Sequence, residues 1–109
     1  MTEQSQTRQG LGKIADFPEF PAEVTIDHDS YFILREEGGE AGEAVYRLVS
    51  AICPHAGGYV RPYNGELICP LHFWSFDAVT GESTNMPGEA LECQPLEVVD
   101  GELFMNKLA

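Results

Sequence analysis

The chain has 109 residues, 43% of them hydrophobic, which allows one small domain with a modest core. Its 18 acidic residues against 6 Lys and Arg give a net charge of −12, a field that repels nucleic acid and anionic membranes and attracts basic partner proteins. The same acidity would also keep a small protein soluble without any partner. The apolar runs are far shorter than the roughly 20 residues of a membrane-spanning helix. Because segment 1–10 is polar and lacks the apolar core of a signal peptide, we expect it to be a flexible terminus of a cytoplasmic protein.

Short segments rich in aliphatic, β-branched and aromatic residues, separated by glycine and proline, predict an all-β fold. In order, the segments expected to form strands are 22–26, 31–35, 44–52, 67–69, 74–76, 96–99 and 102–105. Apolar side chains alternate onto both faces of 44–52, which predicts a strand buried on both sides. The pair Asp100-Gly101, between the last two segments, is typical of a two-residue hairpin turn. We expect an antiparallel sandwich or barrel formed by a single domain over 11–109.

Two segments carry residues that bind metals: CPHAGG at 53–58 and CPLHFWSFD at 69–77. Together they read C-x-H, a spacer of 13 residues, then C-x-x-H. Each pairs a thiol with an imidazole beside a proline, which stiffens the loop. Because three cysteines are an odd number, a full disulfide framework is not expected. The pattern fits a [2Fe–2S] centre with thiolates on one iron and imidazoles on the other. A tetrahedral zinc site is an alternative, although zinc sites favour C-x₂₋₄-C and H-x₃₋₅-H spacings, and four unrelated buried residues are another.

The two segments resemble the cluster loops of the Rieske [2Fe–2S] iron–sulfur family. The resemblance continues into Thr80-Gly81, Pro87 and the closing hairpin, and the region 12–18 is similar to the opening strand of such domains. It implies a Rieske-like antiparallel β sandwich or barrel of short strands, whose two cluster-binding loops fall within about 51–78. It also implies one cluster and its four ligands, with one iron on Cys53 and Cys69 and the other on His55 and His72.

The chain departs from the family pattern in two places. The 13-residue spacer is shorter than usual, and Phe73 stands where many members have glycine after the second histidine. The short spacer bears on the shape of the first loop and leaves the ligand set unchanged.

The resemblance is greatest to the Rieske-type ferredoxins of ring-hydroxylating dioxygenase systems. It implies a monomeric one-electron carrier, not itself an enzyme, that passes electrons from a flavin reductase to a terminal oxygenase and docks on basic faces of both. A complete Rieske oxygenase is excluded, because a 2-His-1-carboxylate iron site needs two further histidines and only His28 is left. The alternative is a small, permanently bound subunit of a multi-subunit oxidoreductase such as a nitrite reductase.

The resemblance also implies a low reduction potential. High-potential respiratory members have a disulfide that braces the loops, at positions held here by Gly58 and Leu71. They also have serine and tyrosine hydroxyls that donate to cluster sulfurs, at positions held here by Trp74 and Phe76. Without these donors, we expect a potential on the order of −150 mV, the low end of the Rieske range.

The remaining histidine and cysteine are expected to have no part in the site. His28 lies between Asp27 and Asp29, which predicts an exposed polar turn. Cys93 lies in a strand-like stretch and is expected to be a small buried hydrophobe.

Overall fold

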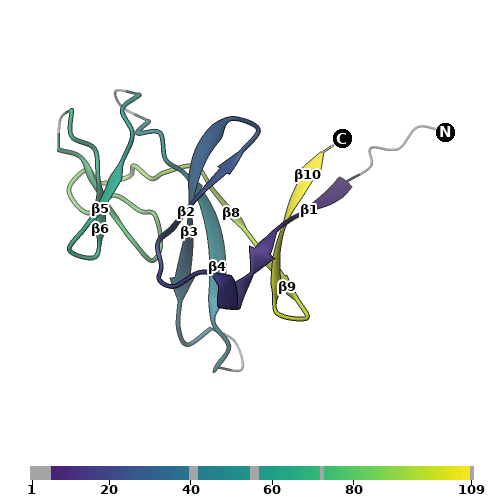
Figure 1. Cartoon of the computed structure of the whole chain (residues 1–109). Coiled ribbons are helices and arrows are strands. Elements are labelled where there is room, and N and C mark those ends of the chain that lie inside the picture. The colour runs from purple at the N-terminus through teal and green to yellow at the C-terminus, as the bar shows by residue number, and fades with distance from the viewer. Residues whose placement is uncertain (1–5, 40–41, 55–56, 72, 109) are drawn as a thin grey trace.

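The computed structural model describes residues 6–39, 42–54, 57–71 and 73–108. In these residues the regular structure is β-strand, apart from the single 3₁₀ turn η1 (Ile14–Asp16). The strands form three antiparallel sheets that follow one another across the molecule (Figure 1). This confirms the expected all-β fold.

The first sheet joins the two ends of the chain. Its strands β1 (Gln6–Lys13), β10 (Glu102–Leu108) and β9 (Glu97–Val99) lie in the order β1-β10-β9. Strand β1 therefore includes residues 6–10, which the sequence assigned to a flexible terminus, and it begins earlier than the strand expected near 12–18. The correction has a simple cause: pairing with β10 uses main-chain groups, so a polar sequence without a strand pattern can still form an edge strand.

The central sheet has four strands in the order β2-β3-β4-β8. These are β2 (Ala22–Ile26), β3 (Asp29–Glu36), β4 (Val45–Ser50) and β8 (Cys93–Pro95). In β4, Val49 and the following Ala51 are buried on one face, while Tyr46 and Leu48 are buried on the other. The prediction that this segment is buried on both sides is confirmed.

The third sheet is small and lies at the far side from the chain ends (Figure 1). It consists of β5 (Arg61–Tyr63), β6 (Glu66–Ile68) and β7 (Ser75–Asp77), in the order β5-β6-β7. Asn64 (φ 50°) and Gly65 (φ 78°) connect β5 to β6 in a two-residue turn with positive φ at both positions. The Asn-Gly pair was a hairpin signal that the sequence analysis passed over. The expected Asp100-Gly101 turn has the same geometry, with φ of 51° and 79°.

Two buried clusters lie on opposite faces of the central sheet. The loop-side core, toward the third sheet, consists of Phe32, Leu34, Val49, Ala51, Cys53, Val60, Leu67, Cys69, Phe76, Ala78 and Leu91. The terminal-side core, toward the first sheet, consists of Ala22, Ile26, Ile33, Tyr46, Leu48, Leu103 and Met105. The central sheet is thus the shared layer, and the loop-side core contains both cysteines of the predicted site.

The third sheet is also tied to the central sheet by polar contacts. Arg47 on β4 donates to the carbonyl of Val79 (3.1 Å) and forms an ion pair with Glu36 (2.7 Å). Val79 belongs to the expected 77–81 turn, in which the Asp77 carboxylate accepts from the backbone N–H groups of Val79 and Thr80. None of the described residues forms a helix long and apolar enough to span a bilayer.

Candidate functional site

The two cysteine loops are closed by the same pair of backbone hydrogen bonds. In the first, the Gly57 N–H donates to the Cys53 carbonyl (3.0 Å) and the Cys53 N–H donates to the Gly58 carbonyl (2.7 Å). In the second, the Phe73 N–H donates to the Cys69 carbonyl (2.9 Å) and the Cys69 N–H donates to the Trp74 carbonyl (2.8 Å). Each loop is therefore a single α-turn closed by an antiparallel hydrogen bond. A proline directly follows each cysteine, where its fixed φ suits the start of such a turn.

The fifth residue of each turn reverses the chain in the left-handed region. Gly57 has φ of 73° and Phe73 has φ of 59°. Glycine is the usual residue at such a position because it has no Cβ to clash. Phe73 therefore occupies a conformation that is costly for an aromatic residue, and the departure noted in the sequence is a point of backbone strain.

The two loops meet at Gly58. A Cβ placed on Gly58 would lie 3.2 Å from the Cys69 Sγ, and 2.9 Å and 3.0 Å from the Leu71 Cδ1 and Cγ. Gly58 thus allows the backbone of the first loop to lie against the cysteine of the second. Cys53 and Cys69, which have 15 residues between them in the sequence, belong to the same core.

Cys53 and Cys69 are 1% and 0% exposed, and neither forms a disulfide. The other two predicted ligands, His55 and His72, lie outside the described residues. Within the described ranges, no group of three or more His, Cys, Asp and Glu side chains lies close enough together to hold a metal ion.

Aromatic side chains from β7 and the residue before it border this core. Phe76 is fully buried, and Trp74 packs against the same cluster with its ring centroid 6.5 Å from that of Phe76. Ser75 lies between them in sequence, and its hydroxyl lies 2.5 Å from the Thr84 Oγ1. The alternation therefore directs Trp74 and Phe76 to the core and Ser75 away from it, as the sequence indicated.

The segment 83–87 is a third loop at the site, and sequence reasoning noted only its proline. The Thr84 N–H and the Ser83 hydroxyl donate to the Ser75 carbonyl (2.9 and 3.0 Å). The Asn85 side chain accepts from the Ser75 N–H (3.1 Å) and donates to the Phe73 carbonyl (2.9 Å). The signal that could have found this contact is the run Ser-Thr-Asn, whose side chains bond readily to nearby backbone.

The two residues expected to stand apart from the site differ in outcome. His28 is exposed in the turn between β2 and β3, as expected. Cys93 was expected to be buried, and that is wrong: it is exposed on β8, the edge strand of the central sheet. Cys93 pairs with Val49, but the loop-side core ends before it reaches this edge.

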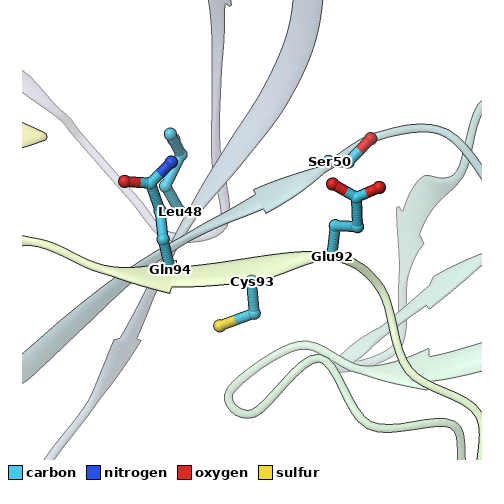
Figure 2. A pocket seen from close by; sticks show the side chains of 5 residues that line it. All are labelled: Leu48, Ser50, Glu92, Cys93 and Gln94. Atoms are coloured by element: carbon cyan, nitrogen blue, oxygen red, sulfur yellow. The ribbon is translucent and has the colours of Figure 1, made fainter. Parts of the chain in front are cut away.

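Cys93 borders an open pocket of about 160 Å³, together with Leu48, Ser50, Glu92 and Gln94. Figure 2 shows its side chain pointing to the opposite side of β8 from those of Glu92 and Gln94. Partial burial raises the pKa of the Cys93 thiol, and the charge of Arg47 opposes the rise. A thiol with a raised pKa is a poor metal ligand and nucleophile at neutral pH, and the pocket contains none of the four predicted cluster residues.

Comparison with known proteins gives both a family and a set of similar folds. The Rieske [2Fe–2S] domain family matches residues 8–97. The plasma membrane Rieske protein PetC3 of the cyanobacterium Synechocystis PCC 6803 is 21% identical, with a TM-score of 0.64 over 91% of this chain and 98% of that one. The ferredoxin of carbazole 1,9a-dioxygenase from Nocardioides aromaticivorans IC177 is 23% identical, with a TM-score of 0.60 over 94% and 97%.

A third similar structure is that of a putative NADH-dependent nitrite reductase small subunit from Mycobacterium tuberculosis. It is 16% identical, with a TM-score of 0.59 over 96% of this chain and 98% of that one. No curated protein sequence matches the chain. At these identities the three structures establish a common fold.

Proposed function

The chain belongs to the Rieske [2Fe–2S] domain family and carries one [2Fe–2S] cluster, and on that premise we propose that it is a Rieske-type ferredoxin. In this role it accepts one electron at a time from a flavin reductase and delivers it to a terminal oxygenase. The ligands are Cys53 and Cys69 on one iron and His55 and His72 on the other. When bound, the cluster supplies reversible one-electron chemistry.

The observation that carries the proposal is the pair of matching loops that converge on one core. Each starts with a buried cysteine, each makes the same two backbone hydrogen bonds, and they touch where Gly58 lies against the Cys69 sulfur. Two similar loops that each offer a thiolate and an imidazole suit a centre with two metal ions. A single tetrahedral zinc site favours C-x₂₋₄-C and H-x₃₋₅-H spacings, and neither loop has one.

The composition of the core also suits a Rieske cluster. Apart from its two cysteines, the described loop-side core has only aliphatic and aromatic side chains, and the nearby buried Ser75 faces Thr84. A charged group would be costly in such surroundings. Two ferric ions, two sulfides and two thiolates cancel in charge, so the oxidised cluster with neutral imidazoles is uncharged, whereas a four-thiolate cluster would carry two negative charges.

Residues around the cysteines would keep water from this centre. Phe76 and Val60 are 0% and 1% exposed, and Trp74 packs against the same core. Low exposure limits the solvent reorganisation that accompanies electron transfer. The electron would then enter and leave at the exposed end of the loops. Leu71 and Phe73, which flank His72 in the sequence, are 55% and 71% exposed and give this end an apolar surface for contact with a partner.

The alternative role is a permanently bound small subunit of an enzyme such as a nitrite reductase. That role needs a large apolar interface, typically above 2,000 Å² of buried surface for an obligate complex. The net charge of −12 supports the carrier, because charged surfaces suit transient docking. The free, exposed thiol of Cys93 suits a reducing compartment, which supports a cytoplasmic carrier.

The ligand set is tested by six variants of the full chain. Replacement of Cys53, His55, Cys69 or His72 by Ala should remove the cluster, because each substitution removes one of the four proposed metal ligands. His28→Ala and Cys93→Ser are matched controls that should keep it, because both residues are exposed and lie outside the loops. Iron and acid-labile sulfide content, with visible and EPR spectra, measure the result.

A colourless wild-type protein that binds zinc would contradict the cluster assignment. Loss of iron in Cys93→Ser would contradict the ligand set.

A further inference from the structure

Phe73 holds the most strained backbone position in the second loop. Its φ of 59° is in the left-handed region, where a residue with a Cβ loses on the order of 1 kcal/mol of conformational free energy. Phe73 is also 71% exposed, so little packing holds it there. The corresponding residue of the first loop, Gly57, adopts φ of 73° without this cost. The second loop therefore needs a contact from outside the loop to hold Phe73 in this conformation. The first loop needs none, because Gly57 adopts the conformation freely.

The Asn85 side chain provides that contact. Its Nδ2 donates to the Phe73 carbonyl at 2.9 Å and its Oδ1 accepts from the Ser75 N–H at 3.1 Å. One amide group thus holds both ends of the tripeptide Phe73-Trp74-Ser75. Its planar donor and acceptor fix the peptide group that follows the left-handed residue.

Asn85 is itself held in position. The Met86 N–H donates to the Ser83 Oγ (2.9 Å), which closes a tight turn around Asn85. Next to it, the Thr84 hydroxyl donates to the Glu66 carboxylate (2.7 Å), so the Ser75 hydroxyl must be the donor to Thr84. Segment 83–86 is therefore fixed to both β6 and β7 before Asn85 reaches the loop.

We infer that Asn85 is a positioning residue for the cluster: it holds the backbone of Phe73 and Ser75, and through them the second cysteine loop, which carries the proposed ligands Cys69 and His72. The inference rests on the function proposed above. Asn85 acts through the backbone of Phe73 and Ser75. Its loss should loosen the loop and change the environment of the imidazole-ligated iron while the fold persists.

The first experiment uses the cluster-free protein, so its result does not depend on the cluster. Hydrogen exchange of the Ser75 amide should accelerate roughly fivefold in Asn85→Ala, the effect of losing one ordinary hydrogen bond. Asn85→Asp separates the two contacts: its carboxylate still accepts from Ser75 but repels the Phe73 carbonyl. In Asn85→Asp the Ser75 amide should stay protected.

The second experiment uses the loaded protein. Both Asn85→Ala and Asn85→Asp should shift the EPR g-values and the reduction potential and should release iron to a chelator several-fold faster than wild type. Adding Phe73→Gly to Asn85→Ala should restore the wild-type values, because glycine adopts the left-handed position without support. His28→Gly is the matched control: it relieves the same kind of conformation (φ 73°) in a distant turn and should restore nothing.

The outcomes separate the two proposals. A wild-type protein without iron or an EPR signal overturns the proposed function and leaves the exchange result to decide the role of Asn85 in the loop. A loaded wild type with Asn85 variants of unchanged spectrum, potential and iron release overturns the positioning role. Equal rescue by His28→Gly and Phe73→Gly also overturns it, because Asn85 would then contribute only to global stability.

Discussion

At the scale of single residues, the buried cysteines and their aromatic neighbours determine the chemistry. Cys53 and Cys69 lie in an apolar core from which water is excluded. Phe76 lies fully buried in the same core and offers no hydrogen-bond donor. The centre is therefore surrounded by groups that exclude water and do little to stabilise the added electron, which favours a low potential.

Phe76→Tyr tests this directly. A wild-type potential on the order of −150 mV is expected from the Rieske range. A tyrosine hydroxyl that donates to a sulfur should raise it by about 60 mV, which corresponds to ~1.4 kcal/mol of preferential stabilisation of the reduced form. Protein-film voltammetry measures both values.

The matched control is Phe32→Tyr, which buries the same hydroxyl in the same core from β3. It should lower stability without changing the potential, because burial of an unpaired hydroxyl costs about 1–3 kcal/mol. A wild-type potential above about +100 mV would mean that other donors dominate and would count against a ferredoxin at the low end of the range.

At the scale of elements, the site depends on the contact between the two cysteine loops. Their internal hydrogen bonds are alike, and the first loop meets the second at Gly58, which lies against Leu71 and the Cys69 sulfur. Leu71 is 55% exposed and can rotate away, whereas Cys69 is 0% exposed and has no room to move. A side chain at position 58 would therefore press on the cysteine sulfur.

Gly58→Ala should lower the iron content of the purified protein. The added methyl also crowds Leu71, so the cluster-free protein should lose about 1 kcal/mol of stability, in the range found for overpacked sites. Combining it with Leu71→Ala should recover the stability but not the iron, because the contact with Cys69 remains. Iron analysis and thermal unfolding measure the two effects.

Gly10→Ala is the control. A Cβ at this position would meet only the Phe104 ring, at 3.4 Å, in the first sheet. Its iron content should equal that of wild type. Full iron loading of Gly58→Ala would mean that the loops do not approach as closely in the loaded protein.

At the scale of the whole molecule, the charge distribution sets how the protein meets its partners. Among the side chains that the structure describes, Arg8 forms an ion pair with Glu97, Arg35 with Glu37, and Arg47 with Glu36. From Pro62 to Asn106 the chain has eight acidic residues and no Lys or Arg, a stretch that passes through all three sheets. The net field is therefore strongly negative, as suits docking to basic faces.

Electron transfer to the physiological partner should consequently slow steeply with added salt. The Debye length falls from about 10 Å at 0.1 M to about 3 Å at 1 M, which removes electrostatic steering between separate proteins. Stopped-flow measurement of the second-order rate over this range tests the carrier role, with sucrose at equal viscosity as a control. A rate independent of salt would favour the permanently bound subunit.

The sequence by itself determined the features that depend on short-range pattern. Alternating apolar residues located most of the strands, Asp100-Gly101 marked a hairpin, and the two Cys–Pro segments marked the loops of the site. These signals are local because strand faces, turn conformations and ligand spacing are fixed within a few residues. They also sufficed to identify the family.

The tertiary structure alone decided which distant segments touch. Pairing with β10 made residues 6–10 part of a strand, and Cys93 came to lie on an exposed sheet edge. The fold also brought Gly58 to the Cys69 sulfur. It brought Asn85 to the Phe73 carbonyl. Apart from the run Ser-Thr-Asn at 83–85, which favours bonds to nearby backbone, these contacts have no local signature. Main-chain pairing accepts almost any residue, and whether a side chain is buried depends on the neighbours that its strand receives in the sheet.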